Sequence, residues 1–65
     1  MKIDVNGVPH DVEAVTVQSA LQALGWGDRR VATALNGTFV PAAARDSTAL
    51  SPGDRLEVLT AMQGG

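Results

Sequence analysis

Hydrophobic and polar positions alternate near the start of the chain. The apolar residues are spaced as in strands on either side of Asn6-Gly7, with Ile3 and Val5 before it and Val8 and Val12 after it. Asn-Gly between two β-prone runs is the strongest short-range hairpin signal, because a type I′ turn needs positive φ at both central residues. The first segment is therefore predicted to be a β-hairpin.

The pattern then changes to helical spacing. Thr16 offers an N-cap hydroxyl, and apolar residues follow at positions i, i+3, i+4 and i+7, namely Val17, Ala20, Leu21 and Leu24. Gly25 is placed to end this helix in the left-handed conformation, and Trp26 just beyond it can fold back onto the helix. One short amphipathic helix is predicted.

Strand signals return after the helix. A strand is predicted over 31–35, and Asn36-Gly37 repeats the hairpin signal before Phe39-Val40, where Pro41 stops the strand. A helical turn is predicted over 42–45. Leu50 lies in a connection that ends in the turn residues 51–54, and the last strand is predicted over 55–60.

The element order is ββαββ with a final strand, and one helix must cover one face of a mixed sheet. A sheet this small needs its apolar strands at the centre, so the last strand is expected beside the first. This is the β-grasp arrangement of ubiquitin-like proteins, an α+β fold. We expect residues 1–60 to form the domain and residues 61–65 to form a flexible carboxyl-terminal tail.

Strand alternation also assigns the faces of the last strand. Leu56 and Val58 should point to the helix, which leaves Glu57 and Leu59 facing outward. An exposed leucine just before the tail is a candidate docking residue, with Glu57 beside it and Met62 as an adaptable contact. An ordinary exposed apolar residue is the alternative.

Composition restricts the remaining classes. The 65 residues fit a single domain, the net charge is −2, and the aromatic residues are one Trp and one Phe, so nucleic acid is not an expected partner. The chain has no cysteine, which fits a reducing cytoplasm. No apolar run has the length of a signal peptide or a membrane span, so we expect a cytoplasmic protein without a membrane partner.

Candidate catalytic groups have simpler structural explanations. His10 is the single histidine and is expected to be solvated or at the edge of the core, so neither a metal site nor a catalytic base is predicted. The serines (Ser19, Ser47 and Ser51) read as helix and turn residues, and the Gly25-Trp26-Gly27 fragment reads as helix termination.

Two charged segments read as solvated surface. Asp11 and Glu13 occupy alternate positions and are predicted to form an exposed strand face rather than a catalytic carboxylate pair. Asp28-Arg29-Arg30 is predicted to be a solvated loop, with contact to a partner as the alternative. The sequence therefore predicts a protein that is not an enzyme.

The chain stops on Gly64-Gly65. Two glycines cannot pack a core, and they lose more backbone freedom on ordering than any other pair. They do form a thin arm without Cβ atoms, which can carry a carboxylate through a narrow channel into the active site of another protein.

The whole chain resembles the ThiS family, the small sulfur-carrier proteins of bacterial thiamine biosynthesis. The resemblance is carried by Val5-Asn6-Gly7, the helix over 17–24, residues 34–37 with Val40-Pro41, residues 50–58, and the ending Met62-Gln63-Gly64-Gly65. Members often have an arginine directly after the proline equivalent to Pro41, whereas this chain has Ala42 there and Arg45 three residues later.

The resemblance implies a role as a protein cosubstrate. The Gly65 carboxylate would be adenylated with ATP on a ubiquitin-activating-type (ThiF-like) enzyme and converted to a thiocarboxylate, while Met62, Gln63 and Gly64 thread into the partner site. A thiazole synthase (ThiG-like) or another acceptor enzyme would then take the sulfur. No bound cofactor is expected, since the partner uses the ATP, and the carrier alone is expected to be a monomer.

Alternatives remain open at the sequence level. The same fold and tail occur in the small subunit of molybdopterin synthase and in carriers for cysteine or specialised metabolites. A ubiquitin-like modifier would end in an isopeptide bond, although Lys2 is the sole lysine available for chain building. A plain β-grasp interaction module with an inert diglycine is the third class.

Overall fold

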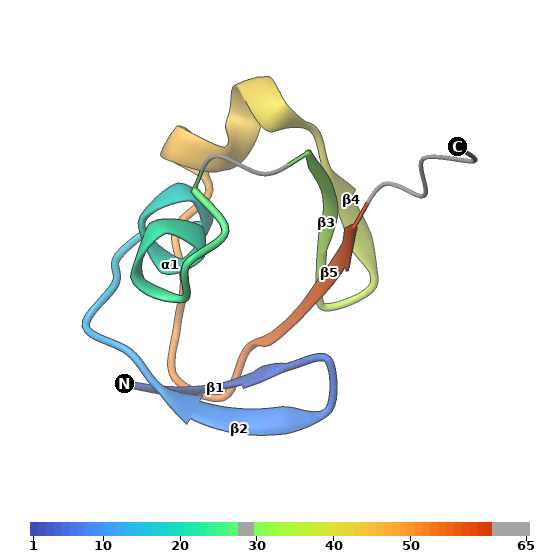
Figure 1. Cartoon of the computed structure of the whole chain (residues 1–65). Coiled ribbons are helices and arrows are strands. Elements are labelled where there is room, and N and C mark those ends of the chain that lie inside the picture. The colour runs from blue at the N-terminus through green and yellow to red at the C-terminus, as the bar shows by residue number, and fades with distance from the viewer. Residues whose placement is uncertain (28–29, 61–65) are drawn as a thin grey trace.

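The computed structural model describes residues 1–27 and 30–60 (Figure 1). Its elements, in chain order, are β1 (Lys2–Val5), β2 (Val8–Asp11), α1 (Val17–Ala23), β3 (Val31–Leu35), β4 (Thr38–Val40), the 3₁₀ helix η1 (Ala42–Ser47) and β5 (Arg55–Thr60). The strands form one five-stranded sheet in the order β2-β1-β5-β3-β4. The predicted element order is confirmed, and the helical turn predicted over 42–45 extends to Ser47.

Two Asn-Gly turns build the two hairpins. Asn6 and Gly7 have φ values of 52° and 83°, and Asn36 and Gly37 have nearly the same values, 50° and 85°. Positive φ at both central residues defines the type I′ turn, whose twist matches that of the flanking strands. Both turns are therefore formed as the sequence predicts.

The carboxyl-terminal strand β5 lies at the centre of the sheet. It is parallel to β1, with Val5 opposite Leu56. On its other side it is antiparallel to β3, in a register that runs from Val31 opposite Thr60 to Leu35 opposite Leu56. The expected return of the last strand beside the first is confirmed.

The amino-terminal end of α1 is closed by a reciprocal pair. The Thr16 Oγ1 atom accepts a hydrogen bond from the Ser19 backbone N–H at 3.1 Å, and the Ser19 Oγ atom accepts one from the Thr16 N–H at 2.9 Å. Such a capping box usually has Glu or Gln at its third helical position, so the serine concealed it in the sequence. Thr16 is the N-cap residue, as predicted.

The carboxyl-terminal end of α1 is a Schellman motif. Gly25 has a φ of 93°, the Trp26 N–H donates to the Leu21 carbonyl at 2.8 Å, and the Gly25 N–H donates to the Gln22 carbonyl at 3.2 Å. The helix ends at Ala23, with Leu24 as its C-cap. Trp26 folds back and packs against the core, as predicted.

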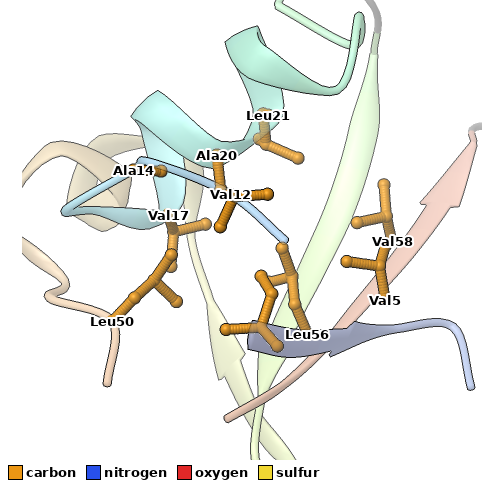
Figure 2. Close-up of a cluster of buried hydrophobic side chains, with 10 residues drawn as sticks. Val5, Val12, Ala14, Val17, Ala20, Leu21, Leu50, Leu56 and Val58 are labelled. Carbon is orange, nitrogen blue, oxygen red and sulfur yellow. The ribbon is translucent and has the colours of Figure 1, made fainter. Parts of the chain in front are cut away.

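The core lies between α1 and the inner face of the sheet (Figure 2). The helix contributes Val17, Ala20 and Leu21, while β5 contributes Leu56 and Val58. Leu50 packs in from the connection before β5, whose backbone joins the start of the helix through the Leu50 N–H and the Val15 carbonyl, 2.8 Å apart. The apolar residues predicted to face the helix therefore do so.

The second strand is shorter than the spacing predicts. Val12 is buried, but it lies beyond the end of β2, and Val8 at the start of that strand is 54% exposed. Glu13 also lies beyond the strand, so the prediction that it shares a strand with Asp11 is wrong, although both are exposed as expected. The reason is that β2 is an edge strand and the chain crosses from its end towards the helix.

Candidate functional site

The last strand separates a buried face from an exposed one. Leu56 and Val58 are 1% and 4% exposed, whereas Leu59 is 69% exposed and Glu57 is also on the surface. This alternation confirms the predicted orientation of the four side chains. It places an apolar side chain on the surface one residue before Thr60, the end of β5.

Leu59 belongs to a larger apolar area, which we call the outer patch and define as Ala32, Ala34, Phe39 and Leu59. Ala34 lies opposite Phe39 on β4, and Ala32 lies opposite Leu59 on β5, so the four residues share the sheet face away from the helix. Phe39 is 66% exposed, and a shallow pocket between Phe39 and Leu59 is lined by both alanines, by Glu57 and by Asn6. Small residues between two large apolar ones leave a surface that a partner side chain can enter.

Phe39 was not predicted as a docking residue, although the sequence held the signal. The two-residue turn at Asn36-Gly37 fixes the register of the hairpin and places Phe39 opposite Ala34. Since Val40 is buried, its neighbour on the strand must face outward. Alternation alone could not choose between Phe39 and Val40, which are both apolar. The register supplies the choice, because the large apolar residues of β3, Val31 and Leu35, face the core and Ala34 faces outward with Phe39.

The Arg45 side chain is hydrogen-bonded to β3 beside this patch. Its Nε donates to the Thr33 Oγ1 atom at 3.2 Å, and its Nη2 donates to the Val31 carbonyl. The buried Thr33 hydroxyl donates in turn to the Val40 carbonyl at 2.8 Å. Arg45 therefore joins η1 to β3, and the position directly after Pro41 carries only the methyl group of Ala42.

Comparison with known proteins identifies this architecture. A family model, the ThiS family, matches residues 3–65, which is nearly the whole chain and includes the final diglycine. The chain belongs to the ThiS family. The crystal structure of the thiamine biosynthesis protein ThiS from Geobacter metallireducens has a TM-score of 0.84 and 35% sequence identity, and the match covers all of both chains. The β-grasp fold is thereby confirmed.

Two curated relatives of different length also match the ThiS-family chain. The thiazole synthase of Magnetococcus marinus is 35% identical over 66 residues, a match that covers all of this chain and 20% of the relative. The ycf40 protein of Pyropia yezoensis is also 35% identical over 66 residues, and the match covers 93% of it. The chain thus spans about a fifth of the thiazole synthase and nearly all of the algal protein.

Part of the predicted site lies outside the described residues. Met62, Gln63, Gly64 and Gly65, predicted to thread into a partner and carry the sulfur, fall beyond Thr60. Asp28 and Arg29 of the predicted solvated loop also lie outside, whereas Arg30 is exposed. The roles of these residues stay predictions. What the structure does define is the strand that leads to the ThiS-type tail and the patch beside it.

The other candidate groups lie in strand, cap and turn positions of the fold. His10 is half-buried in the edge strand opposite Ile3, Ser19 caps the helix, and Ser47 donates to the Ala44 carbonyl at 3.2 Å. Within residues 1–27 and 30–60, no three His, Cys, Asp or Glu side chains are grouped as metal ligands, and no helix is long and apolar enough to cross a membrane.

Proposed function

We propose that this ThiS-family protein is a sulfur carrier whose reactive group is the Gly65 carboxylate. The observation that carries this proposal is the family match, which continues through Gly65 at the end of a fold whose central strand leads directly to the tail. Membership of the ThiS family supports the sulfur-carrier role, and the steps below are our proposal for its chemistry.

The carboxylate must first be activated because it is a poor electrophile. A carboxylate oxygen attacks the α-phosphate of ATP on a ThiF-like enzyme, pyrophosphate leaves, and an acyl-adenylate forms. The terminal sulfur of a persulfide donor then attacks the carbonyl carbon and AMP leaves, which forms an acyl disulfide. A two-electron reductant cleaves its S–S bond, which leaves a terminal thiocarboxylate on Gly65 and returns the donor as a thiol. Glycine favours both attacks because its unbranched α-carbon leaves the carbonyl open.

The acceptor that we propose is a ThiG-like thiazole synthase. Support comes from the Magnetococcus marinus thiazole synthase, in which a segment similar to this whole chain is part of one polypeptide with the enzyme. Joining two proteins covalently raises their effective concentration, which is useful when one delivers a group to the other. The sulfur passes to the acceptor, and water restores the Gly65 carboxylate, so the carrier is consumed and regenerated as a cosubstrate.

Docking on the activating enzyme is assigned to the outer patch. Phe39 and Leu59 are large apolar side chains at 66% and 69% exposure on one sheet face, and exposed apolar patches of this kind mark interaction sites. Glu57 lies at their border and gives the patch a charged edge. A partner bound there would sit beside the end of β5 and would receive the chain that follows it.

The direct test is conversion of the terminal carboxylate. The protein is incubated with ATP, a ThiF-like enzyme, a sulfur donor and a reductant, and the product is fragmented in a mass spectrometer. Exchange of oxygen for sulfur adds about 16 Da, nominally the same as one methionine oxidation, so the added mass must be located on Gly65. A shift found only on Met1 or Met62 would contradict the carrier mechanism, and a covalent adduct would support a protein modifier instead.

Tail-length variants separate reach from folding. Deletion of Gly65 and addition of one alanine after it each displace the carboxylate by about 3.5 Å in an extended chain. Adenylation needs near-attack geometry at the α-phosphate, so ATP–pyrophosphate exchange should fall by at least about 100-fold. Thermal unfolding of the same variants is expected to be unchanged. Undiminished exchange would make the diglycine incidental.

Substitutions in the outer patch test docking. Leu59→Thr keeps a good strand-forming residue and removes the apolar contact, so we expect the KM of the carrier in adenylation to rise about 10-fold, as for a moderate interface hot spot. Glu57→Gln tests the charged edge and is expected to change KM less than Leu59→Thr does. An unchanged KM for Leu59→Thr would move the docking surface elsewhere.

A further inference from the structure

The strand that leads to the tail loses one of its two neighbours, β1, before it ends, while β3 stays paired with it up to Thr60. The parallel pairing of β1 with β5 covers Asp4 opposite Arg55 and Val5 opposite Leu56. The Asn6 N–H makes one more bond, to the Leu56 carbonyl at 3.0 Å, and the chain then turns away into the first hairpin. From Val58 onward, β1 supplies no backbone partner on that side of β5.

The Asn6 side chain takes the place of the missing strand. Its Oδ1 atom accepts a hydrogen bond from the Val58 N–H at 2.8 Å, and its Nδ2 atom donates to the Val58 carbonyl at 3.0 Å. A carboxamide carries the same donor and acceptor as a peptide group, so one side chain satisfies both backbone groups of Val58. The contact joins positions 52 residues apart in sequence.

Asn36 makes the corresponding contact at the other end of β5. Its Oδ1 atom accepts from the Arg55 N–H at 2.9 Å, and its Nδ2 atom donates to the Asp54 Oδ1 atom at 3.0 Å. Each hairpin turn thus contributes one side-chain amide that binds the central strand. Asn36 binds at the beginning of β5, and Asn6 binds at Val58, two residues before β5 ends at Thr60. Of these two amides, only that of Asn6 contacts the part of β5 that leads into the tail, on the side away from β3.

We propose that Asn6 is a positioning residue for the carboxyl terminus, whose side-chain amide fixes the Val58 backbone and thereby the direction in which the chain leaves the sheet towards the partner's active site. The Val58 side chain is 4% exposed and anchors the strand from the core, while the Asn6 amide anchors the same residue from the sheet edge. This inference rests on the proposed sulfur-carrier function.

Two matched variants isolate the side-chain contacts. Asn6→Gly and Asn36→Gly each keep a residue that tolerates positive φ in the turn, and each retains the backbone bond from that residue's N–H to β5. In hydrogen-exchange experiments, the Val58 amide should exchange about 10- to 30-fold faster in Asn6→Gly alone, and the Arg55 amide should exchange faster in Asn36→Gly alone.

Kinetics then distinguish positioning from folding. With the ThiF-like enzyme, ATP, a sulfur donor and a reductant, Asn6→Gly should lower the kcat for thiocarboxylate formation by at least about 10-fold. Asn6 also lines the pocket of the outer patch, so KM is expected to change as well, but by less than about threefold because the four patch residues themselves are unaltered. Asn36→Gly should leave kcat within about threefold of the unaltered protein. Asn6→Asp, which keeps the acceptor for the Val58 N–H and loses the donor, should retain Val58 protection and give an intermediate kcat.

Several results would overturn the inference. Equal kcat values for Asn6→Gly and Asn36→Gly, or unaltered Val58 exchange in Asn6→Gly, would remove the positioning role while leaving the sulfur-carrier function in place. A complete loss of kcat in Asn6→Asp, with the Val58 amide still protected from exchange, would also contradict it. An unaltered protein that forms no thiocarboxylate would instead overturn the proposed function, and with it the role of Asn6.

Discussion

The two hairpins of the sheet have the same type of Asn-Gly turn but differ in the side chains that their two faces carry. In the first, β1 turns Ile3 and Val5 into the core, at 2% and 3% exposure, and its outward positions are the charged Lys2 and Asp4. In the second, the buried face holds the polar Thr33 beside Val40, whereas the outward face carries Phe39. Identical turn chemistry therefore fixes the register of a hairpin without deciding which face is apolar.

Their neighbours explain the difference. The inner face of β1 packs within the core cluster beneath α1, so it needs apolar side chains (Figure 2). At the other edge of the sheet, η1 lies beside β3 and β4. Its Arg45 donates a hydrogen bond to the Thr33 hydroxyl. The first hairpin thus stabilises the fold through burial, and the second combines polar bonding inside with an apolar surface outside.

The largest expected effect on stability comes from the inner face of the first hairpin. Ile3→Ala deletes a side chain that is 2% exposed, and such core truncations cost about 2–5 kcal/mol. A domain of this size has only a few kcal/mol to lose, so urea denaturation should show a variant close to unfolding in water.

The control for Ile3→Ala lies in the same hairpin. Val8→Ala removes an apolar side chain that is 54% exposed, so the free energy of unfolding should change by less than about 1 kcal/mol. Val8 lies opposite Val5 and shares its face, but on the edge strand, so equal losses for the two variants would contradict the concentration of burial in β1.

A smaller effect is expected from the inner face of the second hairpin. Thr33→Val keeps the shape of the side chain and removes the hydroxyl that donates to the Val40 carbonyl and accepts from Arg45. The partly buried guanidinium then lacks one partner, at a cost of about 1–3 kcal/mol in unfolding free energy.

A double-mutant cycle with Arg45→Met tests whether this cost comes from the pair. The two substitutions should be non-additive, because either one removes the same bond. Thr38→Val on the exposed start of β4 is the matched control and should leave the urea midpoint nearly unchanged. Additive losses would mean that Thr33 and Arg45 act separately.

Local signals explain how much of the fold the sequence could predict. The two Asn-Gly turns, the Thr16 cap and the Gly25 helix end each depend on residues a few positions apart, and each forms as predicted. The faces of β5 followed from strand alternation around Leu56. The end of β2 did not, because the chain leaves that edge strand for the helix and the spacing of Val8 and Val12 cannot show this.

Contacts between distant segments were not predictable in the same way. The Asn6 amide meets the Val58 backbone and the Arg45 guanidinium meets Thr33 only because the sheet order brings them together. An asparagine in a turn is fully explained by its positive φ, so its second role leaves no mark in the local sequence. Phe39 is the opposite case, since the register set by the Asn36-Gly37 turn pairs it with Ala34, on the face opposite the larger Val31 and Leu35.

The smallest effect on stability is expected where the second hairpin faces outward. Phe39→Ala alters a side chain that is 66% exposed on an edge strand, so the free energy of unfolding should fall by no more than about 1 kcal/mol, the span of strand propensities. In the proposed docking surface the same change removes the largest apolar contact, and the KM for adenylation should rise about 10-fold.

Val8→Ala, at an exposed apolar position of the first hairpin, should leave KM unchanged, because β2 is the opposite edge of the sheet from β4. ATP–pyrophosphate exchange at several carrier concentrations, measured beside urea denaturation, checks both quantities on the same samples. Equal KM values for the two variants would place the docking surface outside the second hairpin, whereas a rise confined to Phe39→Ala would show that one hairpin serves recognition and the other stability.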